Sequence, residues 1–392
     1  MTTDPTTAGV ATLATPVPRT FGEPPQRFEL PIRFTGSGSE YFRIWIVNLL
    51  LTLVTLTLYY PWAKVRRLRY FYGNTLIDGQ PLGFHATPST MLRGYVLVGS
   101  LGVLYLVAGK VNAIAGAVAF LLIAAVWPAL LRASMQFRLS NTSWRGLRFR
   151  FTGTTAGAYR AMLPWFVPGA IIIASGVAVA DHEHPPAWFG VLSGTVGLAM
   201  MAVAPLLWWA LKKYQHDHFA FGPLQTQLKS GPGAFYAVFG KTFCVAILPA
   251  FALGVVLALV AAARRGGGNV VTLVVLAVVV TIALLVILPL PYFRSRMQNL
   301  LWSRTGNRSM HFNSALRFLP LLGLTLKNWL LVVLTLGLYW PFAAVAMARL
   351  KLEAMSVTSR IDAQTLADQA RGAHADATGE AAGDLFGLDI GF

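Results

Sequence analysis

Residues 111–153 read VNAIAGAVAFLLIAAVWPALLRASMQFRLSNTSWRGLRFRFTG. The first part, Val111–Leu131, is apolar and uncharged over the roughly 20 residues that a helix needs to cross about 30 Å of hydrocarbon. Such a run must be helical, because lipid satisfies no backbone hydrogen-bonding group. The chain then turns basic, and Leu147–Phe151 alternates apolar and charged residues, which is typical of a strand at the surface. This passage therefore predicts a membrane helix followed by a short strand.

Similar apolar runs recur along the 392 residues. Hydrophobic residues make up 55% of the chain and charged residues 12%, about half the share of an ordinary soluble domain, which excludes a disordered protein, a coiled coil and a typical soluble enzyme. We predict an all-α membrane protein, a polytopic helical bundle with internal repeats and short cytoplasmic β-like hairpins. The other runs without charged residues or His are Ile44–Ala63, Gly94–Gly109, Ala161–Ala180, Ala187–Leu211, Thr242–Ala263, Val270–Phe293 and Asn328–Ala348.

The net charge of +17 lies mainly in the joints between these runs. Twenty-one basic residues fall in four long joints, at 63–93, 132–160, 211–241 and 292–327. The three short joints hold only Lys110, Arg264 and Arg265. Basic loops stay on the cytoplasmic side of a membrane, so we predict that the long joints are cytoplasmic. On a soluble chain this charge would suggest nucleic acid, a partner that we do not expect here.

The chain divides into three parts. Residues 1–27 are rich in Thr, Ala and Pro and are expected to form a disordered tail; they hold no apolar segment behind a basic start, so we expect no cleaved signal peptide. Residues 28–356 form the repeat-built transmembrane domain. Residues 357–392 are rich in Ala, Gly and Asp and are expected to be an acidic disordered tail.

The sequence repeats itself internally. The stretch Asn48–Val65 returns in similar form as Asn328–Val345. An Asn-Thr-x-x-x-Gly turn follows thirteen residues after Pro61 and again after Pro128. Asn and Gly tolerate positive φ and suit a tight turn. The predicted repeat-turn residues are therefore Asn74, Gly79, Asn141 and Gly146.

The repeat limits how often the chain crosses the membrane. Arg33–Gly36 is repeated as Arg150–Gly153, and two such segments are expected on the same side. We therefore favour re-entrant or interfacial elements at Ile44–Ala63 and Asn328–Ala348, broken near Thr57 and Gly337. That arrangement leaves six full crossings and cytoplasmic termini. The alternative, eight crossings with inverted ends, would resemble transporters built from inverted repeats.

The N-terminal motif resembles a known family. The lead FTGSGSEYF at residues 34–42, the segment IWIVNLL at 44–50, the stretch TLTLYYPWAK at 55–64 and Asn74-Thr75 are similar to the YjgN family of bacterial inner-membrane proteins. The resemblance covers about Phe34 to Met355. It departs at Thr57, where Gly is expected, and at Ala344, where the second copy lacks Lys. The resemblance implies a multi-pass inner-membrane protein and supplies no activity and no catalytic residues.

Two groups of polar residues are candidates for binding. Asn48 and Asn328 occupy matching places in apolar runs, where a buried amide either lines a polar path or fixes helix packing through hydrogen bonds. A basic segment after Pro61, interleaved with aromatic residues, either binds anionic lipid head groups or sets topology alone. Its predicted lipid-interface residues are Lys64, Arg66, Arg67 and Arg69.

Metal and cofactor chemistry has little support. His182 and His184 flank Glu183 in a short joint and are weak candidates for zinc or copper, with a solvated loop favoured. His216-Asp217-His218 reads similarly, with a structural use favoured. The single cysteine, Cys244, lies in an apolar run and allows no disulfide within the chain. We expect no cofactor and no enzyme, because no nucleotide-binding, metalloprotease or serine-nucleophile motif is present.

Two functions remain open at this point. The first is transport of a neutral or lipid-like solute along the Asn and Thr groups of the repeat interface. The second is a non-catalytic envelope scaffold that binds anionic lipid or protein partners through its basic face and tails. Expected partners are anionic membrane lipids, a second copy of the chain or another envelope protein.

Overall fold

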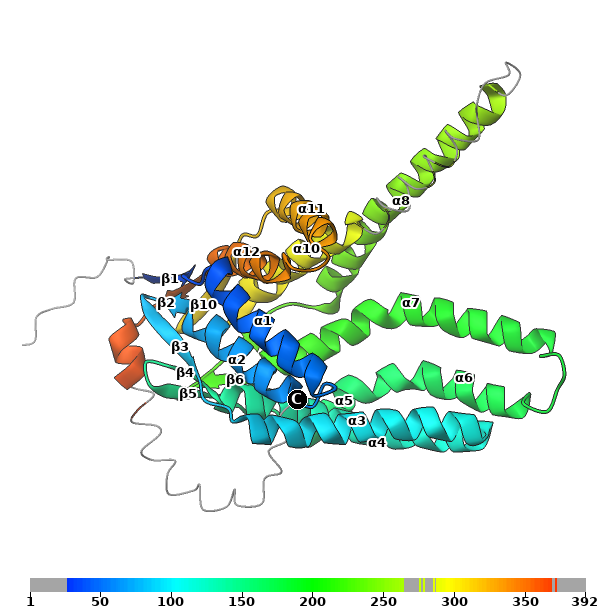
Figure 1. Cartoon of the computed structure of the whole chain (residues 1–392), viewed down its shortest axis with the longest axis horizontal. Coiled ribbons are helices and arrows are strands. Elements are labelled where there is room, and N and C mark those ends of the chain that lie inside the picture. Colours follow the sequence, from blue (N-terminus) through cyan, green and yellow to red (C-terminus); the bar gives the residue numbers. More distant parts are fainter. Residues whose placement is uncertain are drawn as a thin grey trace, which may run out of the picture.

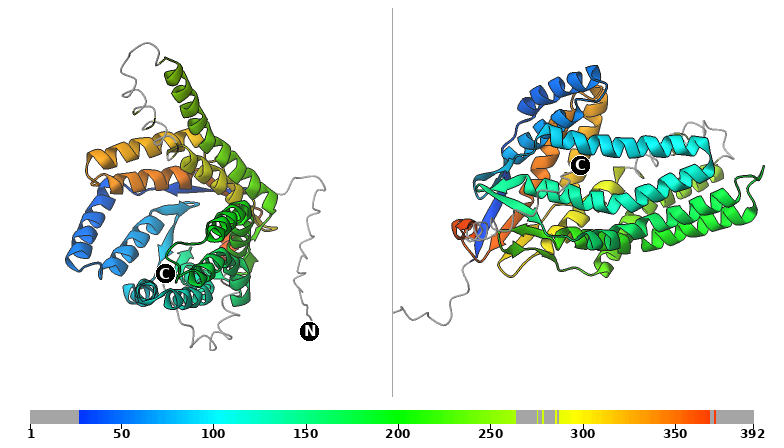
Figure 2. Two further views of the ribbon diagram at one scale, coloured as in Figure 1. Left: turned by 90° about the vertical axis from the view of Figure 1, so that its right-hand side faces the viewer. Right: turned by 90° about the horizontal axis from the view of Figure 1, so that it is seen from below.

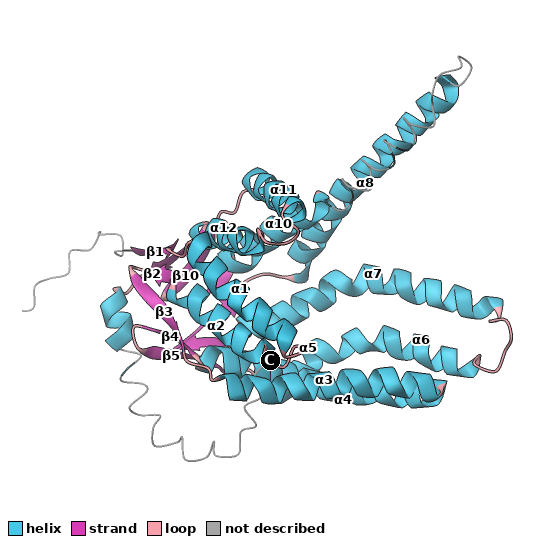
Figure 3. Cartoon of the chain, viewed as in Figure 1, coloured by secondary structure: helices cyan, strands magenta, loops and turns pink. Residues whose placement is uncertain are grey.

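The computed structural model describes residues 27–263 and 287–368, together with Val275, Val278, Leu285 and Arg371. It contains long helices that leave one end of the molecule and strands that gather at the other end (Figures 1 and 3). The helices are α1 (Gly38–Val54), α2 (Tyr60–Gly73), α3 (Pro88–Val111), α4 (Ala113–Ser140), α5 (Thr155–Met162), the 3-10 helix η1 (Leu163–Phe166), α6 (Val167–Ala178), α7 (Ala187–His216), α8 (Pro232–Ala263), α10 (Pro289–Ser303), α11 (Phe318–Leu334) and α12 (Trp340–Glu353).

The all-α prediction is wrong. The short segments at the joints pair with one another into a single 11-stranded antiparallel sheet, rather than forming separate surface hairpins. Each strand has two to seven residues, too few to be recognised locally, and its partners lie in distant joints. The strands are β1 (Phe28–Phe34), β2 (Thr75–Ile77), β3 (Gln80–Phe84), β4 (Thr142–Trp144), β5 (Leu147–Phe151), β6 (Phe219–Phe221), β7 (Leu224–Gln225), β8 (Gln227–Leu228), β9 (Thr305–Gly306), β10 (Met310–Ser314) and β11 (Met355–Ser359).

The sheet closes into a ring. Its strand order is β7-β6-β5-β4-β3-β2-β1-β11-β10-β9-β8. The two outermost strands, β7 and β8, are separated along the chain by Thr226 alone. One short, broken strand at 224–228 therefore pairs with β6 at its start and with β9 at its end, and leaves the sheet without a free run of edge strand.

A backbone hydrogen bond recurs wherever one joint meets the next. The residue that follows a strand donates its amide to the carbonyl of a residue just beyond the C-terminus of a later helix, at 2.7–3.0 Å. In each case that carbonyl lies thirteen residues after a proline: Pro61, Pro128, Pro205, Pro291 or Pro341. The donor and acceptor pairs are Thr35 and Asn74, His85 and Asn141, Thr152 and His218, Lys229 and Arg304, and Ala315 and Ala354.

The helices form a second ring above the sheet. Each helix packs against the next in the order α1, α2, α3, α4, the α5–α6 segment, α7, α8, α10, α11 and α12. Helix α12 in turn packs against α1, which completes the ring. Viewed along the long axis, these helices surround a common centre (left view of Figure 2). The five helices that contain the prolines are α2, α4, α7, α10 and α12. They alternate around the ring with α1, α3, α5–α6, α8 and α11, each of which follows a strand in the chain.

Within the described residues, five helices are long and apolar enough to cross a membrane, namely 88–111, 113–140, 155–178, 187–216 and 232–257. The predicted run Val270–Phe293 falls largely outside the described residues. The first and last helix pairs are short, and both are interrupted where the sequence predicts a break. At the interruptions Thr57 has φ of 73° and Gly337 has φ of 93°.

The main hydrophobic core lies against the sheet ring. It joins Leu30, Trp144, Phe221 and Val357 from four different strands. A short helical segment at 363–368 packs on this core and buries Ala363, Leu366 and Ala367. The predicted disordered C-terminal tail is therefore wrong for residues 357–368, which are folded. The acidic composition of the tail hides the apolar residues at 363, 366 and 367, which share one helix face and pack on the core. The predicted N-terminal tail lies outside the described residues except for Arg27.

Candidate lipid and solute site

The predicted turn residues divide into two kinds. Asn74 and Asn141 end helices α2 and α4 with φ of −92°, so they do not supply the positive φ expected of them. Each side chain instead donates back to a helix carbonyl at 2.9 Å, Asn74 to Tyr70 and Asn141 to Phe137.

Gly79 and Gly146, by contrast, do have positive φ, at 72° and 82°. They follow Asp78 and Arg145, which also have positive φ, in the hairpin turns β2–β3 and β4–β5. Two successive residues with positive φ are typical of a type I′ hairpin turn, whose twist matches that of the flanking strands. Glycine adopts positive φ without strain, which explains why it occupies the second position. The two turns are linked by an ion pair between Arg145 and Asp78 at 2.8 Å.

The repeated Phe-Thr-Gly motif serves close packing. A Cβ atom on Gly153 would lie 2.5 Å from the Phe151 ring and 2.7 Å from the Tyr214 hydroxyl. That hydroxyl donates to the carbonyl of Thr154 at 3.0 Å. Gly36 is enclosed in the same way by Phe34 and by Tyr70. The motif therefore locks the end of a strand onto the helix of the next joint.

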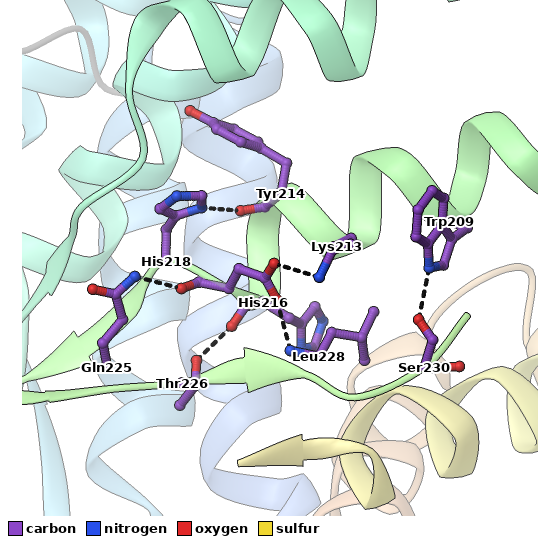
Figure 4. Close-up of polar contacts among 10 residues, drawn as sticks. Trp209, Lys213, Tyr214, His216, His218, Gln225, Thr226, Leu228 and Ser230 are labelled. Carbon is purple, nitrogen blue, oxygen red and sulfur yellow. Dashed lines mark hydrogen bonds and ion pairs between the residues drawn. The ribbon is translucent and has the colours of Figure 1, made fainter. Parts of the chain in front are cut away.

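The segment that closes the sheet ring is held by the end of α7 (Figure 4). The Thr305 hydroxyl donates to Leu301, so its oxygen accepts a 2.9 Å hydrogen bond from Nδ1 of the buried His216. Asp217 accepts from the Leu228 amide at 2.7 Å. It also pairs with Lys213 at 2.8 Å. This histidine and carboxylate thus have structural partners, in line with the structural use that the sequence favours.

The weak metal candidates are not brought together. His182 and His184 lie exposed in the loop between α6 and α7. Among the residues that the structure describes, no group of three or more His, Cys, Asp or Glu side chains is placed to hold a metal ion. Cys244 is exposed on α8, within a helix long enough to cross the membrane.

Asn48 and Asn328 occupy corresponding places on α1 and α11. Each residue is only 7% exposed, and neither Oδ1 atom has a hydrogen-bond partner among the described residues. The Nδ2 atom of Asn328 donates to the carbonyl of Ala343 at 3.4 Å, which fixes the orientation of the amide. A buried acceptor without a partner is costly, so these two oxygens are candidates for binding a donor group.

The predicted basic segment turns its side chains in several directions. Arg66 is exposed and lies over the Tyr59 ring, 5.7 Å from its centroid. Arg69 donates to the carbonyl of Ala86 at 2.9 Å and so has a structural partner. Arg67 lies 5.9 Å from the centroid of the Phe71 ring and borders a cavity. Arg66, Arg67 and Arg69 are thus all exposed, but each has a different neighbour.

The cavity has a volume of about 510 Å³ and is lined by α2, α10, α11 and α12. Because α2 and α10 are not neighbours in the helix ring, a cavity that both of them line lies inside the ring. Its lining includes Asn328, Arg67 and Arg294 and is otherwise mainly apolar. The cavity is the candidate functional site.

Further cations on the proline helices are close enough for their charges to interact. Burial lowers the pKa of Lys64 below its usual value, and the nearby charge of Arg138 on α4 lowers it further. In the same way, burial and then the charge of Arg294 lower the pKa of Lys351. Within the described part of the chain, none of these four side chains forms an ion pair with a carboxylate.

Sequence reasoning missed Arg138, Arg294 and Lys351, although a signal exists. Lys64 and Arg294 lie three residues after their proline, and Arg138 and Lys351 lie ten residues after theirs. Positions three and ten fall on one face of a helix, because two turns separate them. Comparing the five proline helices therefore shows a cation at one of these two positions in four of them, whereas α7 has Trp208 and Gln215 there.

The sheet ring, the apolar helices and the cavity define the class: a membrane protein in which a ring of helices stands on a ring of strands. The chain matches the family described as "Bacterial protein of unknown function (DUF898)" over residues 29–385, and it belongs to that family. The predicted relationship to YjgN proteins is confirmed. No solved structure matches the chain significantly.

Two relatives illustrate the relationship. The chain is 34% identical to inner membrane protein YjgN of Salmonella typhimurium strain LT2 over 122 residues, 30% of each chain. It is 28% identical to inner membrane protein YjgN of Escherichia coli strain K12 over 145 residues, 36% of each chain. The matched part thus spans about a third of these relatives.

Proposed function

We propose that this chain is a multi-pass inner-membrane protein that transports a lipid-like solute through the interior of its helix ring, without an enzymatic step. The observation that carries the proposal is the cavity inside the ring, bordered by a buried amide and by two arginines that form no ion pair with a described carboxylate. Cavities of this size, mostly apolar with a few polar groups, are typical of small-molecule sites. The names of the YjgN relatives support the inner membrane as its location.

The proposed topology has six crossings, cytoplasmic joints and cytoplasmic termini. All four long basic joints contribute strands to the one sheet, so they lie at one end of the molecule. The positive-inside rule supports a cytoplasmic position for that end. The five helices of crossing length extend from the sheet toward the opposite side.

The short helix pairs α1–α2 and α11–α12 are proposed as re-entrant hairpins. At about 1.5 Å per residue, α1 and α11 reach only about 26 Å, and they begin next to the sheet. The tips of these hairpins are apolar and exposed: Leu56 is 85% exposed and Leu336 is 94% exposed. Hydrocarbon is the environment that suits such tips.

We also propose that the chain consists of five internal repeats. Each repeat would comprise a proline helix, a strand hairpin and the helix that follows. The fifth hairpin pairs β11 with β1, so this repeat is split between the two ends of the chain. The recurrent proline spacing and the recurrent amide-to-carbonyl hydrogen bond support this view.

The transport proposal is tested in vesicles that contain the purified full-length protein. Fluorescent phospholipid in the outer leaflet is reduced by dithionite, so the rate of exchange between leaflets is measured directly. We expect the double variant Asn48→Leu and Asn328→Leu to lower this rate, and the exposed control Thr195→Val to leave it unchanged. If the double variant is correctly folded and exchange proceeds at the wild-type rate, transport along these amides is excluded.

A scaffold role is the second candidate, and the exposed guanidinium of Arg66 favours it. Near a membrane surface each cation contributes about 1 kcal/mol to the binding of anionic lipid. Partners in this case would be anionic lipids, a second copy or another envelope protein. The change Arg66→Gln would then weaken binding to anionic vesicles while the exchange rate stays constant.

A further inference from the structure

We propose that the cavity between α2, α10, α11 and α12 binds the head group of an anionic glycerophospholipid that carries a free hydroxyl. The phosphate would lie between the guanidinium groups of Arg67 and Arg294, and the hydroxyl would donate to Oδ1 of Asn328. This inference rests on the proposed function, since it names the class of lipid-like solute and the place where it binds.

The charge around the cavity selects an anion. Arg67 and Arg294 come from α2 and α10, on different sides of the ring, and none of the lining residues is Asp or Glu. Lys351 adds a third cation next to Arg294. Phosphate is the group that paired guanidinium groups bind best, through charge-assisted hydrogen bonds from a planar donor fork. A neutral or zwitterionic solute would leave these charges uncompensated.

The amide of Asn328 distinguishes between anionic lipids. Its Nδ2 atom donates a hydrogen bond to the carbonyl of Ala343. The atom without a described partner is therefore the acceptor Oδ1. The side chain is more than nine-tenths buried and borders the cavity. A glycerol or similar hydroxyl on the head group supplies the missing donor, whereas a bare phosphate or a trimethylammonium group does not.

The walls and the surroundings of the cavity suit a lipid rather than a free phosphate. Leu68, Val332 and Ala348 offer apolar surface beside the two arginines. Trp329, which also borders the cavity, is 64% exposed. The site thus continues toward the lipid-facing surface, where an acyl chain can leave it.

The shape of the ring provides the entry route. The short hairpins α1–α2 and α11–α12 are neighbours, because α12 packs against α1. Among the described helices, none of crossing length lies on this side of the ring, whereas α3 to α8 surround the other side. The cavity lies between these short hairpins, so a head group enters it from the bilayer without crossing a wall of long helices.

The test measures binding by native mass spectrometry of the full-length protein in detergent. The probes are dioleoyl phosphatidylglycerol, dioleoyl phosphatidic acid and dioleoyl phosphatidylcholine. We expect phosphatidylglycerol to bind most tightly. Arg67→Gln and Arg294→Gln should each weaken its binding about fivefold, which corresponds to about 1 kcal/mol per cation. Asn328→Leu should weaken phosphatidylglycerol binding to the level of phosphatidic acid.

Two matched controls lie close by. Arg66 has the same charge on the same helix but does not border the cavity, so Arg66→Gln should leave the affinity within twofold. Leu326 lies on α11 with Asn328 but does not border the cavity, so Leu326→Ala should preserve the preference for phosphatidylglycerol. Arg67→Lys, which keeps the charge, together with a symmetric size-exclusion peak separates lost binding from misfolding.

The outcomes separate this inference from the proposed function. Equal binding of phosphatidylcholine, or an equal loss in Arg66→Gln and Arg67→Gln, overturns the cavity as the head-group site. A preference for phosphatidic acid that survives Asn328→Leu assigns the site to phosphate alone and overturns the hydroxyl contact. If the cavity variants lose phosphatidylglycerol binding but leaflet exchange is unchanged, the binding site stands and transport fails.

Discussion

Leu30 lies directly opposite Val357 in the antiparallel pairing of β1 with β11. The first and the last strands of the described chain therefore complete the sheet, and both side chains are buried in its core. The sheet ring depends on a contact between residues near opposite ends of the sequence.

We predict that Leu30→Ala lowers the free energy of unfolding by about 2–4 kcal/mol, because it leaves a cavity in this core. Glu29→Ala, at the neighbouring exposed position, should change it by less than about 0.5 kcal/mol. Thermal unfolding in detergent, followed by circular dichroism, measures both. Equal stability of the two variants would show that the strand pairing contributes little.

Gly153→Ala is predicted to destabilise the protein by about 1–3 kcal/mol. The added methyl group would lie too close to the Phe151 ring and the Tyr214 hydroxyl to be accommodated without movement. Gly99→Ala on α3 is the control, since nothing lies within 4 Å of the new atom. Unfolding midpoints should fall for the first variant and stay constant or rise for the second.

The hairpin tips offer a test of backbone strain. Gly337 has φ of 93°, so Gly337→Ala should cost about 1 kcal/mol. Thr57 holds the matching place at φ of 73° with a β-branched side chain, and Thr57→Gly should relieve a similar amount. Gly323→Ala, inside α11, is the matched control and should be neutral or stabilising. A loss of stability in Thr57→Gly would contradict this account.

Sidedness is tested by labelling single cysteines. In a Cys244→Ala background, Gln80→Cys places a thiol on exposed β3 and His182→Cys places one in the loop between α6 and α7. If the sheet faces the cytoplasm, an impermeant maleimide applied to intact spheroplasts should label position 182 and leave position 80 unlabelled. The reverse pattern would invert the proposed orientation.

Much of the fold could be read from the sequence, and the reasons are local. Runs such as Val111–Leu131 identify helices by length and composition alone. The breaks at Thr57 and Gly337 follow from comparison of two similar segments. Gly79 and Gly146 have the positive φ that was expected, whereas Asn74 and Asn141 end helices, because a short amide can satisfy either geometry.

The remainder depended on contacts between distant joints. The pairing of β5 with β6, for example, joins residues about 70 positions apart. The sequence of Leu147–Phe151 alone does not indicate which strand it pairs with. The cavity likewise combines Arg67, Arg294 and Asn328, which no local pattern connects. Asn328 was singled out from the sequence, but the unused oxygen that makes it informative is visible only in three dimensions.

The pairing of β1 with β11 also has a consequence for biosynthesis. During translation β1 leaves the ribosome before the other described strands, and its partner β11 leaves after them. The backbone groups of β1 that bind β11 therefore stay unpaired while the membrane helices are inserted. Contacts between such distant segments form slowly. Ring closure is therefore expected to be the final, post-translational event of maturation, and chains truncated before Met355 should be recognised by quality-control proteases as unfinished.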